Sequence, residues 1–304
     1  MPELPDVVVY LEAFERHVLG RRLEWVRLAS PFLVRSFDPP VSAAEGRRVT
    51  GLSRLGKRIV WRLEGDLHLV FHLMIAGRFR WRERGAPSKQ VALPKKNGLA
   101  AFDFEHGTVL LTEASSKKRA SLHVVAGAEG LAEHDRGGLE VLDADAEAFG
   151  AALARENHTL KRALTDPRIL SGIGNAYSDE ILHRARTSPF KRTSQLTPEE
   201  TRRLHAAAVE VLGEWIERSR REVGDGFPEK VTAFRPEMAV HGRYGRHCPV
   251  CGTPVQRLIY AENEANYCPT CQTGGKLLAD RALSRLMRED WPKTLEELEA
   301  RKRA

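Results

Sequence analysis

The pattern of apolar positions divides the chain into a strand-rich first part and a helical second part. Apolar residues recur at helical spacing over residues 7–19, which predicts a helix that ends at Gly20: Val8, Leu11, Phe14 and Val18. From residue 23 to about 125 the apolar runs are short or alternating. The strands that we expect there are 59–63, 67–71, 103–105, 108–111 and 121–125. Short strands separated by turns predict an antiparallel sandwich or barrel.

A change of composition marks the passage to the helical part. Residues 132–150 contain Gly137-Gly138 and six acidic side chains, which is typical of a linker. Beyond it the period predicts helices at 176–186 and 197–218, and a charged helix at 294–303. Leu277, Leu278, Leu283 and Leu286 also recur at helical spacing, and we expect Trp291 to pack on the body. The domains that follow are 1–135, 150–240, 241–275 and a tail of 276–304.

Length and charge narrow the class of protein. A chain of 304 residues can hold two domains with their own cores. Its formal charge of +7 and pI of about 9.4 suit a polyanion such as nucleic acid, although many soluble proteins are mildly basic. No apolar run approaches the ~20 residues of a membrane helix. We therefore expect no membrane partner.

The four cysteines form two Cys-x-x-Cys pairs separated by sixteen residues: Cys248, Cys251, Cys268 and Cys271. Two such pairs can complete a tetrahedral zinc site, and the alternative is two disulfides. The first residues do not resemble a signal peptide, which favours a reducing cytoplasm where disulfides are rare. The pattern predicts a structural zinc ion, since four thiolates leave no open position for chemistry.

The first residues carry candidate chemistry. Met1 precedes a small residue, so we expect its removal, which leaves Pro2 with a free secondary amine. An α-amino group titrates near pH ~8, so part of it is unprotonated at neutral pH and could form a Schiff base. Glu3 beside it could supply acid or base. The alternative is an ordinary frayed terminus.

Two loops could contact an anion. Lys57 lies in a turn before a predicted strand, and is either a solvated lysine or a ligand for a substrate phosphate or sugar. The stretch 171–175 contains Gly172 and Gly174, which permit a tight turn, and Asn175, which could cap the next helix. A glycine-rich turn into a helix N-terminus could hold a DNA phosphate. The alternative is an ordinary helix corner.

In this order and at these separations, the features resemble the formamidopyrimidine-DNA glycosylase and endonuclease VIII family of base-excision repair enzymes. The resemblance runs from Pro2 to about Gln272. Its marks are Pro2-Glu3-Leu4-Pro5, the Lys57 turn, His72-Leu73 with Gly77 beyond, the turn 172–175, and the finger ending at Gln272. The resemblance implies an α+β multidomain fold. An N-terminal helix would lie on an antiparallel β-sandwich, followed by a helix–two-turns–helix domain with a C-terminal zinc finger.

The resemblance also implies a bifunctional glycosylase and lyase for an oxidised base. The base is flipped out of the duplex, Pro2 attacks C1′ of its sugar, and Glu3 assists ring opening by proton transfer at the ring oxygen. The Schiff base then permits β-elimination and commonly δ-elimination. Lys57 would bind a phosphate next to the lesion, and Asn175 with the amides around Gly174 would hold the backbone. Beyond the structural zinc no cofactor is needed, because an iminium at C1′ is itself an electron sink.

The sequence departs from the family pattern in its recognition elements. Asn263, in an acidic stretch, replaces a finger arginine that contacts phosphate, which should weaken the electrostatic grip. The stretch 113–119 lacks the aromatic residue and proline that help fill the gap left by the flipped base. Three basic side chains there could reach the orphaned base: Lys117, Lys118 and Arg119. Ile75 replaces a gap-filling methionine, with Met74 beside it, so an apolar wedge remains available.

Three functions are compatible with these features. The first is a DNA glycosylase with lyase activity, acting as a monomer on damaged double-stranded or single-stranded DNA in a bacterial cytoplasm, associated with the nucleoid. The second is a protein that binds damaged or unusual DNA without turnover, which the altered recognition elements would permit. The third is a zinc-ribbon interaction protein unrelated to DNA, which leaves the Pro2-Glu3 start unexplained. The sequence does not specify which base is removed.

Overall fold

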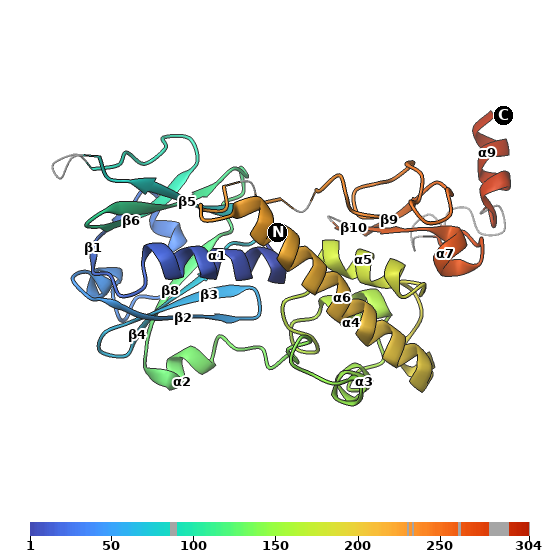
Figure 1. The fold of residues 1–304 in the computed structure, drawn as a ribbon, viewed down its shortest axis with the longest axis horizontal. Coiled ribbons are helices and arrows are strands. Elements are labelled where there is room, and N and C mark those ends of the chain that lie inside the picture. Colours follow the sequence, from blue (N-terminus) through green and yellow to red (C-terminus); the bar gives the residue numbers. More distant parts are fainter. Residues whose placement is uncertain (86–89, 230, 233, 261–262, 280–291, 304) are drawn as a thin grey trace. The chain divides into compact units, whose positions relative to one another are not determined.

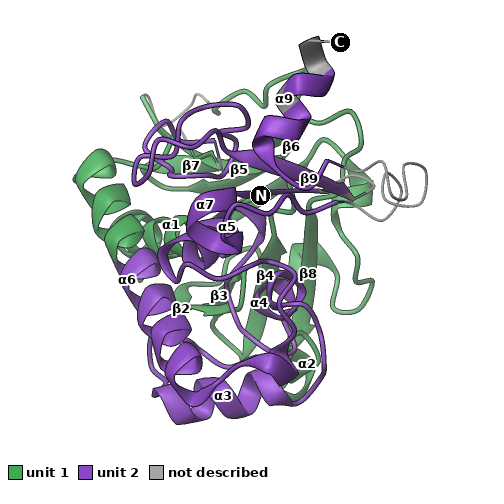
Figure 2. Cartoon of the chain, turned by 90° about the vertical axis from the view of Figure 1, so that its right-hand side faces the viewer, with its two compact units in different colours: residues 1–137, 214–232 green, residues 138–213, 233–304 purple. Residues whose placement is uncertain are grey.

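The computed structural model describes residues 1–85, 90–229, 231–232, 234–260, 263–279 and 292–303, and divides into two compact units (Figure 2). The first unit comprises Met1–Gly137 and Glu214–Thr232, and the second comprises Gly138–Gly213 and Ala233–Ala304. No helix in the described part of the chain is both long and apolar enough to cross a membrane.

The first unit is a β-sandwich with a helix beside it (Figure 1). One sheet has the order β1-β6-β7-β5 and the other β2-β3-β4-β8, and neighbouring strands within each sheet pair antiparallel. Its elements are α1 (Leu4–His17), β1 (Leu23–Leu28), β2 (Val49–Leu55), β3 (Arg58–Leu63), β4 (Leu67–His72), β5 (Gly77–Glu83), β6 (Gly98–Phe104), β7 (Gly107–Glu113), β8 (Ser121–Ala126) and α2 (Gly127–Ala132), with short 3-10 turns at Pro31–Leu33 and Val41–Ala44. The predicted strands and sandwich are confirmed.

Aromatic side chains fill the core between the two sheets and α1. Trp61 of β3 and Phe79 of β5 come from opposite sheets, and Phe14 of α1 lies edge-to-face with both, each at a ring-centroid distance of 5.0 Å. All three are fully buried. Since the alternating pattern places one face of each strand in this core, the sheets and the helix form one hydrophobic unit.

Truncation of Phe14 tests how far this core stabilises the unit. Phe14→Ala should lower the free energy of unfolding by about 3–5 kcal/mol, because it removes buried aromatic area and leaves a cavity. Phe37→Ala is the matched control, since Phe37 is 95% exposed and its loss should change stability by less than about 0.5 kcal/mol. Urea denaturation followed by tryptophan fluorescence measures both. Equal effects would contradict the packing described here.

The second unit is helical, with a two-stranded hairpin. Its elements are α3 (Ala146–Ala154), α4 (Leu160–Thr165), α5 (Asn175–Arg184), a 3-10 turn at Thr193–Gln195, α6 (Pro198–Val223), β9 (Gln256–Tyr260), β10 (Asn263–Tyr267), α7 (Pro269–Thr273) and α9 (Leu295–Arg303). The C-terminal part of α6, from Glu214, belongs to the first unit. This helix extends five residues beyond the predicted end at residue 218, and Gly224 follows it with a φ of +55°.

The predicted linker is partly structured. Leu139 forms a parallel bridge with Leu170, and Ser171 Oγ lies 2.5 Å from a Glu140 carboxylate oxygen, so the segment after Gly138 is part of the second unit.

In the tail, the Leu278 backbone N–H donates to the Tyr267 hydroxyl at 2.7 Å. Three residues of the predicted tail lie outside the described residues: Leu283, Leu286 and Trp291.

Candidate functional site

The chain start is held as the cap of α1. The helix begins at Leu4, three residues before the predicted start, because Pro5 fits the first turn and Glu3 occupies the N-cap position. The Glu3 backbone N–H donates to Asp6 Oδ2 at 2.9 Å. Pro2 and Glu3 are both buried, and Glu3 is 1% exposed. The start of the chain is therefore anchored to the helix, as a reactive terminus requires.

Charged groups of the first unit converge on this terminus. Burial lowers the pKa of the Met1 α-amine below its usual value, the negative charge of Glu3 opposes that shift, and Arg78 and Lys57 add to it. Burial also lowers the pKa of Lys57, again against the influence of Glu3. Glu3 and Lys57 thus both act on the Met1 amine, and burial of that amine favours its neutral form.

Lys57 lies in a two-residue turn between β2 and β3. Gly56 has a φ of +59°, a conformation that glycine adopts readily, and Leu55 pairs with Arg58 across the turn. His72, at the end of β4, pairs with Arg58. Burial, followed by the charges of Arg58 and Lys57, lowers the pKa of His72 to about 4. Cationic side chains therefore cluster at this corner of the sheet.

The turn after β4 presents an apolar side chain to solvent. Ile75 is 55% exposed, and Met74 has a φ of +51°, which is strained for a residue with a side chain. The Gly77 backbone N–H closes the turn on the Leu73 carbonyl at 2.9 Å, and Arg78 Nη1 donates to the Ile75 carbonyl at 3.2 Å. A Cβ on Gly77 would lie 2.3 Å from the Leu73 oxygen, so this close approach requires glycine.

The basic stretch after β7 is folded over a buried carboxylate. Glu113 is 1% exposed, and its oxygens accept the backbone N–H groups of Arg119, at 3.1 and 2.9 Å, and Ala120, at 3.1 Å. Lys118 also donates through Nζ to the Glu113 carbonyl. The side chains of Lys117, Lys118 and Arg119 are exposed. The predicted gap-filling candidates are thus presented on a backbone that one carboxylate holds in place.

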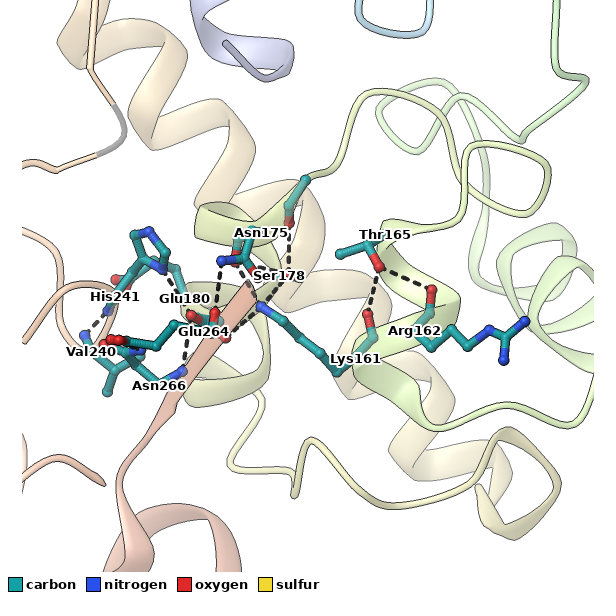
Figure 3. A network of polar contacts seen from close by, with 12 residues as sticks. Lys161, Arg162, Thr165, Asn175, Ser178, Glu180, Val240, His241, Glu264 and Asn266 are labelled. Atoms are coloured by element: carbon teal, nitrogen blue, oxygen red, sulfur yellow. Dashed lines mark hydrogen bonds and ion pairs between the residues drawn. The ribbon is translucent and has the colours of Figure 1, made fainter. Parts of the chain in front are cut away.

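The glycine-rich turn of the second unit leads into α5, with Gly172 at a φ of +80°. The prediction that Asn175 caps this helix is wrong. Gly174 occupies the N-cap position, and Asn175 is the first helical residue. Its side chain reaches the hairpin instead, where Asn175 Nδ2 donates to the Glu264 carbonyl at 2.7 Å (Figure 3). A glycine cap leaves the side chain at the next position available for that contact.

The four cysteines converge as the spacing predicts. Their sulfur atoms all lie within 4.8 Å of one another. Cys248 Sγ lies 3.9 Å from Cys271 Sγ, and Cys251 Sγ lies 3.4 Å from Cys268 Sγ. These separations exceed the ~2.05 Å of a disulfide and approach the roughly 3.8 Å between sulfurs of a tetrahedral site with ~2.3 Å metal–sulfur bonds. The donor set fits a closed metal site.

The hairpin that joins the cysteine pairs contains Asn263, which the family resemblance predicts to stand in place of an arginine. The Asn263 backbone starts β10 opposite Tyr260, and its side chain lies outside the described part of the structure. On the neighbouring strand, Arg257 stacks on Tyr244 with its guanidinium carbon 4.3 Å from the ring centroid. Arg257 Nη1 also lies 3.5 Å from Glu264 Oε2.

Several residues of these regions were missed from sequence. Asp6 could have been found from its three-residue spacing to Glu3, which is typical of a capping box. Arg78 and Glu113 gave no signal, because a charged residue in a strand is ordinary unless its partners are known. Asp179, a buried residue of α5 that lies 2.5 Å from Lys161 Nζ, was hidden in the same way, within a helix that the sequence does predict.

Comparison with known proteins decides the family. Residues 1–117 match the model for the formamidopyrimidine-DNA glycosylase N-terminal domain, and residues 138–225 match the model for its H2TH domain. Formamidopyrimidine-DNA glycosylase of Thermus thermophilus is 35% identical over 284 residues, covering 90% of this chain and 100% of that protein. The chain belongs to the formamidopyrimidine-DNA glycosylase family. The homologue of Solibacter usitatus is 31% identical over 278 residues, with 90% and 99% covered.

Solved structures of family members share the fold. The crystal structure of the Thermus thermophilus protein matches with a TM-score of 0.73 at 33% identity, covering 89% of this chain and 98% of that chain. Lactococcus lactis Fpg in complex with an abasic-site-containing DNA matches with a TM-score of 0.76 at 24% identity, covering 89% and 99%. The fold expected from the family resemblance is therefore confirmed.

Proposed function

We propose that this family member is a DNA glycosylase with lyase activity, which removes an oxidised base through a Schiff base on Pro2. The observation that carries the proposal is the anchored chain start, where Pro2 and Glu3 are buried and the Glu3 backbone N–H donates to Asp6 Oδ2 at 2.9 Å. The charges of Glu3 and Lys57 both act on the Met1 amine beside Pro2. Membership of a glycosylase family supports DNA as the substrate. We further propose that the protein acts as a monomer in base excision repair.

The chemistry requires only groups of the chain, the sugar and water. After removal of Met1, the Pro2 nitrogen forms a bond to C1′ while the bond between C1′ and the base breaks, and the base leaves with a proton. Proton transfer from Glu3 to the ring oxygen accompanies opening of the sugar and gives an iminium. Loss of a C2′ proton then expels the 3′ phosphate, and a second elimination expels the 5′ phosphate. Water releases the enzyme by hydrolysing the imine.

The remaining predicted residues have binding roles in this proposal. Lys57 takes a phosphate next to the lesion, and Asn175 with the Gly174 amide holds the backbone. Ile75, with Met74, forms the apolar wedge that fills the gap in the base stack. The exposed basic stretch at 117–119 contacts the orphaned base or its strand.

The metal of the four-cysteine site is proposed to be zinc. Four thiolates in a tetrahedral arrangement suit zinc, and a closed site provides folding energy without an open position for chemistry. In this role Cys248, Cys251, Cys268 and Cys271 hold the ion that keeps the β9–β10 hairpin folded for DNA binding.

The rate of Schiff-base formation should depend on pH in a direction set by burial. Burial lowers the pKa of the Met1 α-amine. Pro2 is also buried, so we expect burial to act in the same direction on its amine after Met1 is removed, and only the neutral amine attacks the sugar. The trapping rate on abasic DNA should therefore rise with pH to a plateau. The midpoint of this rise should lie below pH ~8, the ordinary pKa of an α-amine. Single-turnover trapping across pH 5–9 measures this midpoint. A midpoint at or above 8 would contradict the proposed burial of the nucleophile.

Borohydride trapping combined with a nicking screen tests the proposed function. The protein should form a covalent complex with abasic duplex DNA and nick at least one oxidised-base substrate in a panel of duplex and single-stranded lesions. Tight binding with no trapping and no nicking across the panel would instead favour a damage-binding protein without turnover. The altered stretch at 113–119 and Asn263 are the features that would favour that second function.

A further inference from the structure

One face of α5 is aligned with the cysteine-containing module of the second unit. Asn175, Asp179 and His183 are spaced by four residues, so they lie on the same side of the helix. Each makes a polar contact with the segment 239–272. Asn175 contacts the Glu264 carbonyl, as described above, and His183 Nε2 lies 3.3 Å from Cys248 Sγ. The helix that starts with the proposed phosphate ligand is thus connected to the finger along its length.

Asp179 is the central contact of this face. Its side chain is 1% exposed and lies 2.5 Å from Lys161 Nζ through Oδ1. Its other oxygen, Oδ2, accepts from His241 Nδ1 at 2.8 Å and from the Asn266 backbone N–H at 3.1 Å. Figure 3 shows Lys161, His241 and Asn266 gathered at this network. A buried carboxylate with three donors is a well-determined anchor, because each donor would otherwise lose its partner.

The distance between successive contact residues is similar on α5 and on β10. Four residues of α5 rise about 6 Å, and two residues of a strand advance about 6.7 Å. Asp179 holds the Asn266 backbone while Asn175, four residues earlier, holds the Glu264 carbonyl, two residues earlier on β10. Asn266 Nδ2 also donates to Glu264 Oε1 at 2.8 Å. Fixing Asn266 therefore fixes the carbonyl that orients the Asn175 amide.

We propose that Asp179 is a positioning residue that sets the Asn175 amide for a DNA phosphate by holding β10 against α5. This inference rests on the proposed function, in which Asn175 contacts the DNA backbone. An amide NH2 has two donors, so the contact with Glu264 directs one N–H and thereby aims the other. Asp179 touches neither DNA nor the reacting sugar, and acts through Asn266, Glu264 and Asn175.

A double-mutant cycle tests this route. Asp179→Asn keeps the side-chain volume but removes the charge, and should weaken binding to a duplex with a non-reactive abasic analogue about tenfold. In an Asn175→Ala background the same change should weaken binding by less than about twofold, since its effect passes through Asn175. Glu210→Gln is the matched control. It also removes one negative charge, and it breaks the exposed contact of 3.2 Å between Glu210 Oε2 and Arg184 Nη1 of α5. It should leave affinity within about twofold.

A second pair of variants keeps the test independent of a folding defect. His241→Ala removes one donor to Asp179 and should weaken DNA binding. His241→Asn retains an N–H near the Nδ1 position and should therefore keep most of the affinity that His241→Ala loses. Thermal melting confirms that each variant is folded. An equal tenfold loss in the Asn175→Ala background, no loss in Asp179→Asn, or no rescue by His241→Asn would overturn the proposal. The analogue cannot form a Schiff base, so these results do not depend on Pro2. Failure of trapping in the unmodified protein would refute the proposed chemistry alone.

Discussion

A protein whose chain start is extended by a cleavable peptide should form no borohydride-trapped complex with abasic DNA until that peptide is removed. An amide nitrogen at Pro2 has no basic lone pair and cannot form an iminium. Because the nucleophile is lost, we expect trapping and strand cleavage to fall by at least about a thousandfold. Cleavage directly before Pro2 should restore both activities in the same preparation, which serves as its own control.

DNA binding separates this effect from a general defect. The extended protein should remain folded, since α1 is anchored through the Glu3 backbone contact to Asp6 and through its aromatic core. Its melting temperature should change little, and any lost affinity for an abasic analogue should be far smaller than the lost trapping. Trapping that persists at a comparable rate in the extended protein would assign the Schiff base to another amine, with Lys57 the first to examine.

Removal of the metal should have the second large effect. Structural zinc contributes on the order of 10 kcal/mol or more to the folding of small zinc modules. Cys268→Ser should therefore abolish stoichiometric zinc and unfold the hairpin, and the loss of the Glu264 contact should weaken DNA binding by at least about tenfold. The first unit should keep its own unfolding transition, because its core is built from its own residues.

Another substitution in the same module provides the control for zinc. The hydroxyl oxygens of Thr253 and Thr270 lie 2.7 Å apart at an exposed position and connect the two cysteine pairs. Neither threonine belongs to the four-cysteine metal site. Thr270→Ala should retain zinc and DNA affinity. Zinc content by atomic absorption, together with melting curves before and after chelation, measures both variants. A fully folded, DNA-binding Cys268→Ser protein without metal would show that the four sulfurs have no structural role.

The sequence predicts the parts of this molecule that depend on local periodicity. Short alternating or apolar runs identified strands such as 59–63, and the cysteine spacing predicted the convergence of the four sulfurs. The start of α1 was placed three residues late, because the apolar spacing begins at Val7, whereas the helix already includes Pro5, which is well accommodated in the first helical turn. The assignment of Asn175 as a cap failed for a related reason, since a glycine one residue earlier can occupy that position.

Contacts between distant segments could not be predicted in the same way. Glu113 is read from sequence as one charge at a strand end, yet the fold buries it under residues 119 and 120. Asp179 is read as a polar residue within a helix, but its partners His241 and Asn266 come from segments more than 60 residues later. The energy of these contacts depends on burial and on the register of β10. The periodicity of apolar residues specifies neither.

Mass spectrometry of the trapped complex tests the central claim most directly. After reduction with borohydride, nuclease treatment and proteolysis, the deoxyribose-derived adduct should be found on the N-terminal peptide, with Met1 absent and fragmentation placing the added mass on Pro2. An adduct on Lys57 or another lysine, or active protein that retains Met1, would contradict the account.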